Sequence, residues 1–276
     1  MKNVMILAGA GQIGMAIARR TGYNMKIVIG DKQITNAQAV SKTMNEAGFD
    51  TEAYEMDLAD RTSVHEFVTY AASLGPVKVL VNAAGVSPSQ APIESILEID
   101  LYGTAMLLEE TRDVIEPGGV GIVISSQSGK RMGALTAQQD ELLATTPAEE
   151  LLDLEMLQPA NVHDTLHAYQ LAKRCNEKRV MAEAVHWGKR EARINSISPG
   201  IIVTPLALDE FNGPRGDFYK SMFAKAPAGR PGTADEVANV AELLMSERGA
   251  FITGTDVLID GGATASYYYG PLKPEA

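Results

Sequence analysis

The sequence predicts a doubly wound α/β domain over residues 1–276, in which one parallel sheet of about seven strands is flanked by helices. Short apolar runs bounded by turn residues alternate with longer amphipathic stretches, which is the pattern of repeated strand-helix units. The chain is long enough to bury the core of one such domain, and no repeat, low-complexity tract or linker divides it. We expect strands at Val4–Ala8, Lys26–Gly30, Thr51–Glu55, Val77–Ala83, Gly121–Ser125, Arg193–Ser198 and Asp256–Ile259.

The net charge and the cysteine content of the chain indicate which partners and which cellular location to expect. A formal net charge of -11 and a sequence pI near 4.9 disfavour phosphate backbones and anionic lipid surfaces, so we expect no nucleic-acid or membrane partner. The apolar stretch from Val4 breaks into glycines, so it is not expected to be a signal peptide, and no apolar run approaches a membrane span. One cysteine, Cys175, excludes an intrachain disulfide and favours a reducing, cytoplasmic location.

A glycine fingerprint follows the first expected strand and opens a helix. Gly9, Gly11 and Gly14 form GxGxxG, in which glycine permits a tight turn, close approach of a pyrophosphate and close helix-sheet packing. Asp31, at the end of the second strand, is placed to accept hydrogen bonds from an adenosine ribose, and its charge favours NAD over NADP. The adjacent Lys32 can partly compensate a 2′-phosphate and so weakens this preference. A strand-helix turn that binds no ligand would show the same glycines.

A tyrosine and a lysine four residues apart indicate proton transfer. If the segment from Asp164 to His186 is helical, Tyr169 and Lys173 lie on one face, one turn apart. A phenol normally loses its proton near pH 10, and a nearby ammonium group stabilises the phenolate. This spacing is also common by chance in helices, so the hypothesis depends on the surrounding motifs.

Two segments break the alternation of strands and helices. Residues 131–166 hold seven carboxylates and one base with apolar residues between them, and we expect a surface excursion beside the site. Residues 206–227 contain Gly213-Pro214-Arg215-Gly216 and five aromatic or methionine side chains, which indicates a mobile lid with an apolar underside. A solvated acidic face and a plain amphipathic helix are the alternative interpretations of the two segments.

Taken in order, these motifs resemble those of the short-chain dehydrogenase/reductase family, and the resemblance extends from the first strand to about Ala265. It implies a Rossmann-type fold. The resemblance rests on the glycine fingerprint, the Tyr-Lys pair and further segments that follow successive strands. These segments are Asp57-Leu58, Asn82-Ala83-Ala84-Gly85, Ser125-Ser126-Gln127-Ser128-Gly129 and Ser198-Pro199-Gly200-Ile201-Ile202-Val203-Thr204.

The resemblance implies a role for each matching position. Ser126 would hold the substrate oxygen while Tyr169 exchanges a proton with it, and Lys173 would lower the pKa of Tyr169 and bind the nicotinamide ribose. Asp57 would lie beside the adenine. The further residues expected at the cofactor are Gln12, Ile13, Leu58, Asn82, Ala83, Ala84, Gly85, Pro199, Gly200, Ile202 and Thr204.

Three features depart from the family pattern. The glycine run lacks the usual three-residue gap between its first two glycines. Tyr169 comes 43 positions after Ser126, where about a dozen is usual in the family, so residues 131–166 are interpreted as an insertion that shapes the substrate site. Asp100 stands where the family commonly has a proton-relay asparagine, and we count it among the candidate catalytic residues. Its carboxylate either pairs with Lys173 and weakens the effect on Tyr169, or supports the relay through its backbone carbonyl.

The expected function is reversible oxidation of a secondary alcohol to a ketone with NAD, on a hydrophobic or ring-bearing, steroid-like substrate. His163 and His167 lie four apart, but the segment lacks the HExxH pattern, so no metal is expected. The resemblance implies a homotetramer with an interface at helices near residues 100–115 and 165–186, and the Tyr267–Pro271 tail would dock on a neighbour or close over a site. The alternatives are a catalytically silent cofactor-binding regulatory or scaffold protein and, less favoured, an epimerase or dehydratase on the same fold.

Overall fold

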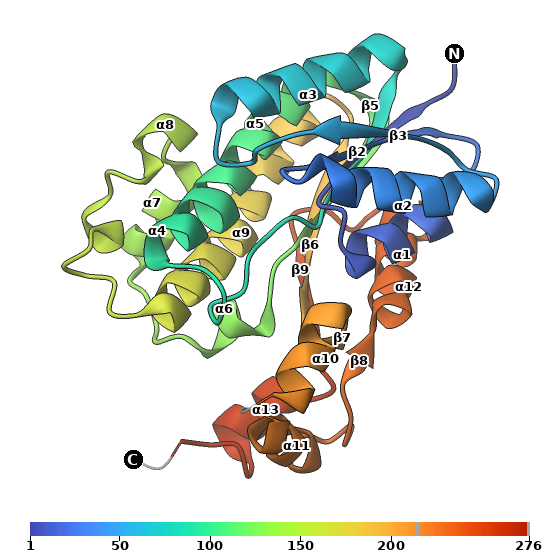
Figure 1. Cartoon of the computed structure of the whole chain (residues 1–276). Helices are drawn as coiled ribbons and strands as arrows, with labels where there is room; N and C mark the ends of the chain where they lie inside the picture. The colour runs from blue at the N-terminus through green and yellow to red at the C-terminus, as the bar shows by residue number, and fades with distance from the viewer. Residues whose placement is uncertain (214–215, 275–276) are drawn as a thin grey trace.

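The computed structural model describes residues 1–213 and 216–274 and confirms the predicted seven-stranded parallel sheet. The strand order is β3-β2-β1-β4-β5-β6-β9, so the direction of winding reverses between β1 and β4, and Figure 1 shows helices on both sides of the sheet. The bounds are β1 Val4–Ala8, β2 Lys26–Asp31, β3 Asp50–Glu55, β4 Val77–Asn82, β5 Ile115–Ile124, β6 Arg193–Pro199 and β9 Asp256–Ile259.

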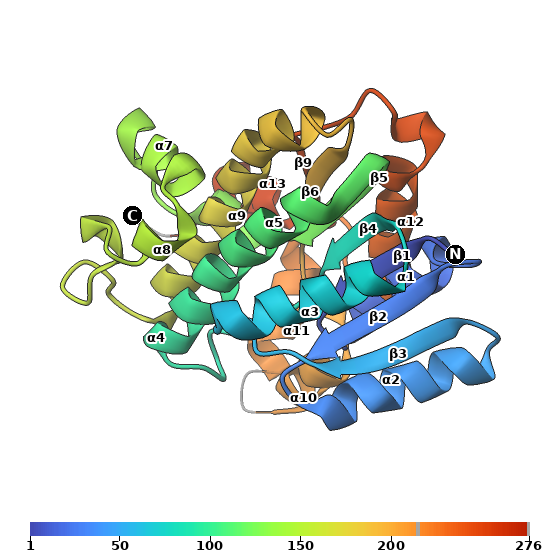
Figure 2. The same ribbon diagram turned by 90° about the horizontal axis from the view of Figure 1, so that it is seen from above.

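The first strand shows how the sequence divides the core into two layers. All five residues of β1 are buried, and because strand side chains alternate, they enter different clusters on the two faces of the sheet. Met5 and Leu7 pack with α1 (Gln12–Thr21), α2 (Ile34–Glu46) and α12 (Ala234–Met245). Val4, Ile6 and Ala8 pack on the opposite face, which is covered by α3 (Arg61–Leu74), α5 (Thr104–Val114) and α9 (Thr165–Gly188). Figure 2 shows α3, α5 and α9 side by side on that second face.

The predicted helix at 164–186 is confirmed as α9. Asp164 caps it by accepting a hydrogen bond from the His167 backbone N–H at 2.7 Å. Between Leu171 and Val180, α9 is buried on nearly every side because the sheet, α5 and the preceding segment 131–166 surround it. Trp187, fully buried near the C-terminal end, packs against Gly121, where a Cβ atom would lie 2.9 Å from the indole ring.

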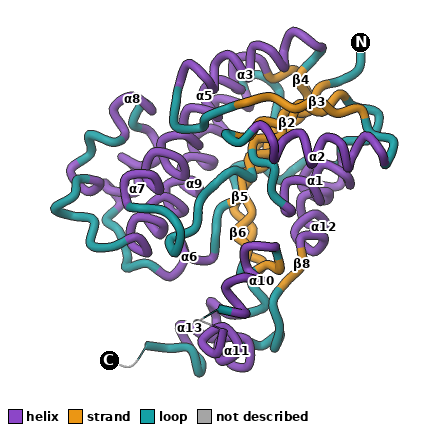
Figure 3. Tube along the Cα trace, viewed as in Figure 1, coloured by secondary structure: helices purple, strands orange, loops and turns teal. Residues whose placement is uncertain are grey.

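The segment 131–166 is ordered and mostly helical. After α6 (Gln127–Arg131) come α7 (Ala137–Thr145), α8 (Ala148–Leu151) and a 3-10 turn at Glu155–Leu157. Figure 3 shows these short helices joined by loops at one end of α9. Part of the negative charge in this segment is paired, since Asp140 bridges Arg174 at 2.7 Å and Lys178 at 3.0 Å. Five buried apolar side chains anchor the segment in the core, namely Leu143, Ala148, Leu151, Leu157 and Val162.

The predicted lid contains α10 (Pro205–Asn212) and α11 (Gly216–Lys225), while its Pro214 and Arg215 lie outside the described residues. The rings of Phe211, Tyr219 and Phe223 pack edge to face, with centroids 5.2–5.4 Å from Phe211. A two-stranded sheet of β7 (Ile202–Val203) and β8 (Gly232–Thr233) lies between the lid and α12. The sequence analysis did not predict this sheet, because two-residue strands are too short to show an alternation of apolar and polar residues.

The C-terminal tail contacts its own chain. In α13 (Ala263–Tyr269), the Tyr268 hydroxyl donates to the Lys130 carbonyl at 2.5 Å, and the Arg131 guanidinium lies 5.4 Å from the Tyr267 ring centre. The helix α13 packs against α6 and α11, and docking of the tail on a neighbour or closure over a site stays a prediction. Within the described residues, no helix combines the length and apolarity that a membrane crossing requires.

Candidate active site

Two hollows at the carboxyl ends of the strands bring most of the predicted site residues together. They lie where the winding of the sheet reverses, and they share the segment Ala83–Val86 as a common wall. The first, of about 320 Å³, is lined among others by Gly9, Gly11, Asp31, Lys32, Asp57, Leu58, Ala83, Ala84 and Gly85. The second, of about 250 Å³, is lined among others by Ile13, Ser126, Tyr169, Lys173, Pro199, Gly200, Ile202 and Thr204.

Four predicted site residues line neither hollow. Gly14 permits close packing instead, since a Cβ there would lie 2.9 Å from the Leu7 side chain. Asn82 is buried and fixes the shared wall, donating to the Thr104 hydroxyl and accepting from the Ala84 backbone N–H. Gln12 is exposed in the first turn of α1. The fourth, Asp100, lies behind the second hollow and reaches it through Lys173.

The glycine loop forms a cradle at the N-terminus of α1. Gly9 has φ +92°, which disfavours a side chain, and a Cβ there would meet Ala84 N at 2.6 Å. Gly11 is the N-cap of α1, and no atom lies within 4 Å of where its Cβ would be. The exposed N–H groups of a helix start favour an anion, so this loop fits the pyrophosphate of a dinucleotide.

The Asp31 carboxylate is fixed at the edge of the first hollow. One oxygen accepts from the Ala10 N–H at 3.0 Å and the other from the Gln33 N–H at 2.9 Å. Lys32, which was expected to weaken the NAD preference, is engaged elsewhere, because its ammonium lies 2.7 Å from the Asp57 carboxylate. That ion pair raises the pKa of Lys32, and Asp57 has a lowered pKa because the bonds from Lys32 and the Ala59 N–H outweigh burial.

Ser126, Tyr169 and Lys173 meet in the second hollow, as the motif order predicted. Ser126 caps α6, and its oxygen accepts from the Ser128 N–H at 3.2 Å, which leaves its own proton for the Tyr169 oxygen. The Lys173 ammonium is 5.2 Å from the centre of the Tyr169 ring. The Ser125 hydroxyl donates to the Lys173 carbonyl at 2.8 Å and thereby joins the end of β5 to α9.

Asp100 forms the ion pair that one of the two sequence interpretations described. It is fully buried in a π-helical turn, Leu97–Gly103, a local irregularity that is frequent at functional sites. One carboxylate oxygen accepts from the Val86 N–H at 2.8 Å, and the other lies 3.3 Å from the Lys173 ammonium. Gly85 makes room for this pair, because a Cβ there would lie 2.9 Å from the Asp100 oxygen.

Burial dominates the protonation of the Tyr169 phenol. Burial raises its pKa and the Asp100 charge adds to that, while Lys173 and the Ser126 hydrogen bond lower it by less, so the net shift is upward. Lys173 lowers the pKa of Tyr169 as expected, but burial outweighs this effect. Burial alone would lower the pKa of Lys173, but Asp100 and Tyr169 outweigh it and keep the ammonium charged.

The two histidines stack on each other at the surface, whereas the cysteine is buried. His163 and His167 stack with ring centres 4.8 Å apart at the start of α9, and His167 Nδ1 accepts from the His163 N–H at 3.3 Å. No group of three or more potential metal ligands occurs among the described residues. Burial raises the pKa of the Cys175 thiol to about 12, as expected for a core residue.

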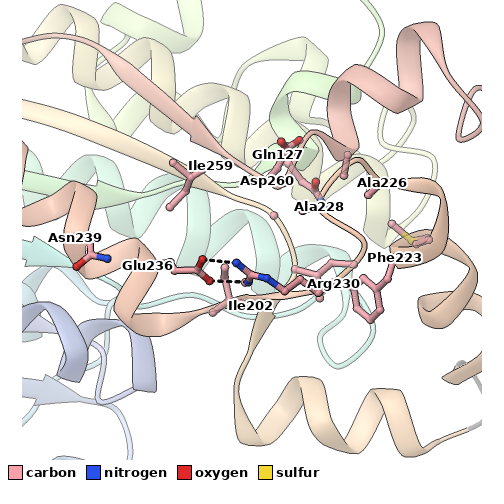
Figure 4. A pocket seen from close by; sticks show the side chains of 16 residues that line it. Gln127, Ile202, Phe223, Ala226, Ala228, Arg230, Glu236, Asn239, Ile259 and Asp260 are labelled. Atoms are coloured by element: carbon pink, nitrogen blue, oxygen red, sulfur yellow. Dashed lines mark hydrogen bonds and ion pairs between the residues drawn. The ribbon is translucent and has the colours of Figure 1, made fainter.

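A third hollow, of about 310 Å³, lies beneath α11 and shares Gly200 and Ile202 with the second. Its lining is mainly apolar, and Figure 4 shows Phe223 of α11 beside Arg230, whose contacts with Glu236 measure 2.7 and 2.9 Å. Gln127, next to Ser126, also lines it. The sequence reading did not assign Gln127, Arg230 or Asp260 to a site, although Gln127 stands within the serine motif.

Comparisons with known proteins agree with this geometry. Residues 2–138 match the family model described as short chain dehydrogenase, and residues 134–264 match the one described as Enoyl-(Acyl carrier protein) reductase. The short-chain dehydrogenase/reductase bsc3 of Alternaria brassicicola is 36% identical over 270 residues, which cover 96% of each chain. D-threitol dehydrogenase of Mycolicibacterium smegmatis is 29% identical over 276 residues (95% of this chain, 93% of the relative). The 7alpha-hydroxysteroid dehydrogenase of Bacteroides fragilis is 25% identical over 266 residues (95% and 94%).

A solved structure shows the same fold. The short-chain dehydrogenase/reductase from Serratia marcescens superposes with a TM-score of 0.74 at 22% identity and covers 95% of this chain and 98% of its own. The fold, the ordered motifs and these relatives place the protein in the short-chain dehydrogenase/reductase family. It is an oxidoreductase of that family.

Proposed function

We propose that the protein interconverts a secondary alcohol and a ketone with NAD, using Tyr169 as the proton-exchanging group and Ser126 and Lys173 as its partners. The convergence of these three side chains in the second hollow, which shares a wall with the first, carries the proposal. A cofactor-binding protein without turnover has no need for a phenol, a hydroxyl and an ammonium group in one pocket.

The hollows fit a dinucleotide. The glycine cradle faces a helix start that favours a pyrophosphate, Asp31 offers carboxylate oxygens to a ribose, and the shared wall joins this half to Tyr169. When bound, the nicotinamide supplies or accepts the hydride. The chain itself positions the substrate oxygen through Ser126, moves a proton at the Tyr169 oxygen, and holds a positive charge beside it on Lys173.

We propose NAD rather than NADP because, among the described residues, no cation neutralises the Asp31 carboxylate, which faces the expected position of the adenosine ribose. Asp31 keeps its carboxylate at the hollow through two backbone hydrogen bonds, and the neighbouring Lys32 is paired with Asp57. A 2′-phosphate would meet repulsion from Asp31 and would have to compete with Asp57 for the ammonium.

A hydrophobic or ring-bearing alcohol suits the apolar surfaces near the second hollow. The third hollow adjoins it and presents Phe223, Met222 and Ile259. Relatives named for hydroxysteroid and cyclohexane substrates support this choice, whereas the D-threitol relative points to a small polyol. A substrate panel therefore needs both classes.

We further propose a cytoplasmic homotetramer. The expected contact along α9 is restricted to the part after Val180, since α7 packs on the helix as far as Arg179, and the exposed Met181 and Val185 are available there. Phe251, fully exposed, and the edge strand β9 with exposed Leu258 offer a second surface. Analytical ultracentrifugation, with Met181→Lys as the variant, measures the oligomeric state directly.

The test is turnover with NAD and with NADP on a panel of steroids, cyclic alcohols, polyols and the matching ketones, followed by nicotinamide absorbance. Tyr169→Phe is expected to reduce turnover by at least about 1000-fold while nicotinamide fluorescence still reports cofactor binding. Tyr23→Phe, at an exposed tyrosine, is the matched control. Cofactor binding without turnover of any panel member contradicts the proposed activity.

A further inference from the structure

Asp100 is a buried carboxylate that the reaction described above does not require. Its side chain is fully shielded from water, and its position is fixed by the Val86 N–H on one oxygen and by Lys173 near the other. A buried charge at such a place is costly unless it is paired, so the ion pair with Lys173 is a defined part of the fold. Of the groups around Tyr169, Lys173 is the one that lowers the pKa of its phenol most.

The Lys173 ammonium lies close to two groups, the Asp100 carboxylate and the Tyr169 ring. Its ammonium is 3.3 Å from the Asp100 oxygen and 5.2 Å from the Tyr169 ring centre. A positive charge stabilises a phenolate, but the Asp100 charge opposes this from the same side of the pocket. The Ser126 hydroxyl, from the start of α6, adds one hydrogen bond to the Tyr169 oxygen.

We propose that Asp100 is a positioning residue that opposes the Lys173 charge, so that proton exchange at Tyr169 takes place at a higher pH than it would beside an unpaired lysine. This inference rests on the proposed function, because it concerns the proton-exchanging group of the same site. An asparagine at residue 100 would accept the Val86 N–H equally well but would leave the Lys173 charge unopposed. The raised pKa of Tyr169, to which burial and then Asp100 contribute, agrees with the direction.

The chemistry balances in the reductive direction. The carbonyl carbon of the ketone receives a hydride from the reduced nicotinamide, which is oxidised, and the C=O π bond breaks. The carbonyl oxygen takes the Tyr169 proton, so the phenolic O–H bond breaks and an alcohol O–H bond forms. The phenolate left behind regains a proton from solvent. For oxidation Tyr169 has to be deprotonated first, which the Asp100 charge disfavours.

The experiment measures the protonation of Tyr169 without any substrate. Ultraviolet difference titration of the wild-type protein against Tyr169→Phe isolates the tyrosinate band of this one residue. We expect its midpoint above about pH 10, the ordinary value of tyrosine. In Asp100→Asn, titrated against the double variant that also lacks the phenol, we expect the midpoint about one pH unit lower. Glu98→Gln removes an exposed carboxylate from the same turn and is expected to move the midpoint by less than about 0.3 units.

The second measurement uses the pH profiles of kcat/KM in both directions, for a substrate found in the panel. In Asp100→Asn, oxidation is expected to reach its plateau about one pH unit lower, and reduction to decline from a correspondingly lower pH. A wild-type midpoint near pH 7, or equal midpoints in wild type and Asp100→Asn, overturns the inference. Should Asp100→Asn fail to fold, the wild-type midpoint alone decides. If nothing in the panel turns over, the proposed function fails, while the titration still tests Asp100.

Discussion

Replacing Asp31 by asparagine tests the cofactor preference at its physical origin. The carboxylate is held in the first hollow by two backbone N–H groups at 2.9 and 3.0 Å, and the amide keeps the shape while removing the charge. Two unit charges about 5 Å apart repel by about 3 kcal/mol at an effective dielectric constant of about 20. A phosphate carries nearly two charges, and the openness of the hollow to solvent roughly halves the effect, so about 3 kcal/mol remains.

That free energy corresponds to a change of about 100-fold in selectivity. We expect the ratio of kcat/KM for NAD to that for NADP to fall by about this factor in Asp31→Asn, through a gain with NADP as well as a loss with NAD. Asp57→Asn, which releases Lys32, is the companion variant and is expected to favour NADP by a smaller factor. A ratio that stays within about threefold of wild type in Asp31→Asn refutes the electrostatic argument.

Three further changes test the loop, the insertion and the core. Gly9→Ala forces a Cβ against Ala84 N at 2.6 Å with φ +92°, so we expect a loss of about 2 kcal/mol or more of stability by denaturant unfolding and weaker cofactor binding by fluorescence titration. Asp140→Asn removes the two ion pairs with α9 and is expected to lower the free energy of unfolding by about 1–3 kcal/mol. An unchanged free energy of unfolding would contradict the packing of α7 on α9 described above. Burial alone would raise the pKa of Asp140, but its basic partners hold it below the ordinary value, so this stabilisation is present above about pH 4 and lost as the pH falls through the folded-state pKa. Cys175 is expected to react with a thiol reagent at pH 8 only in denaturant, and labelling of the native protein contradicts its burial.

The sequence predicted the parts of the fold that local chemistry determines. Helix α9 begins at the Asp164 cap, and the strands follow from apolar runs that end at turn residues. Because parallel strands end at one edge, the motifs after β1, β2, β4, β5 and β6 were bound to gather in one place. The serine, tyrosine and lysine of the candidate site meet there as the order of the motifs implied.

The remaining features depend on distances between segments far apart in the chain. Whether the residue 100 carboxylate pairs with Lys173 is decided by a π-helical turn and by the space that Gly85 leaves, and no local pattern encodes either. The early start of β5 at Ile115 arises from an irregular register with β4, where Pro117 and two glycines interrupt the apolar pattern. The engagement of Lys32 by Asp57 likewise joins the ends of two strands.

The packing of α7 on α9 limits how this enzyme can be shortened. Arg179 of α9 donates to the carbonyls of Leu143 and Thr146 at the end of α7, and Leu143 also accepts a bond from the Cys175 thiol. Joining residue 131 directly to residue 164, to restore the usual family spacing, would leave a nearly inaccessible guanidinium without these acceptors and would expose Leu171 to water. The 131–166 segment is part of the scaffold that holds α9. Natural or engineered variation in this segment is therefore expected at the exposed positions of α7 and its loops, while the face of α7 that contacts α9 stays constant.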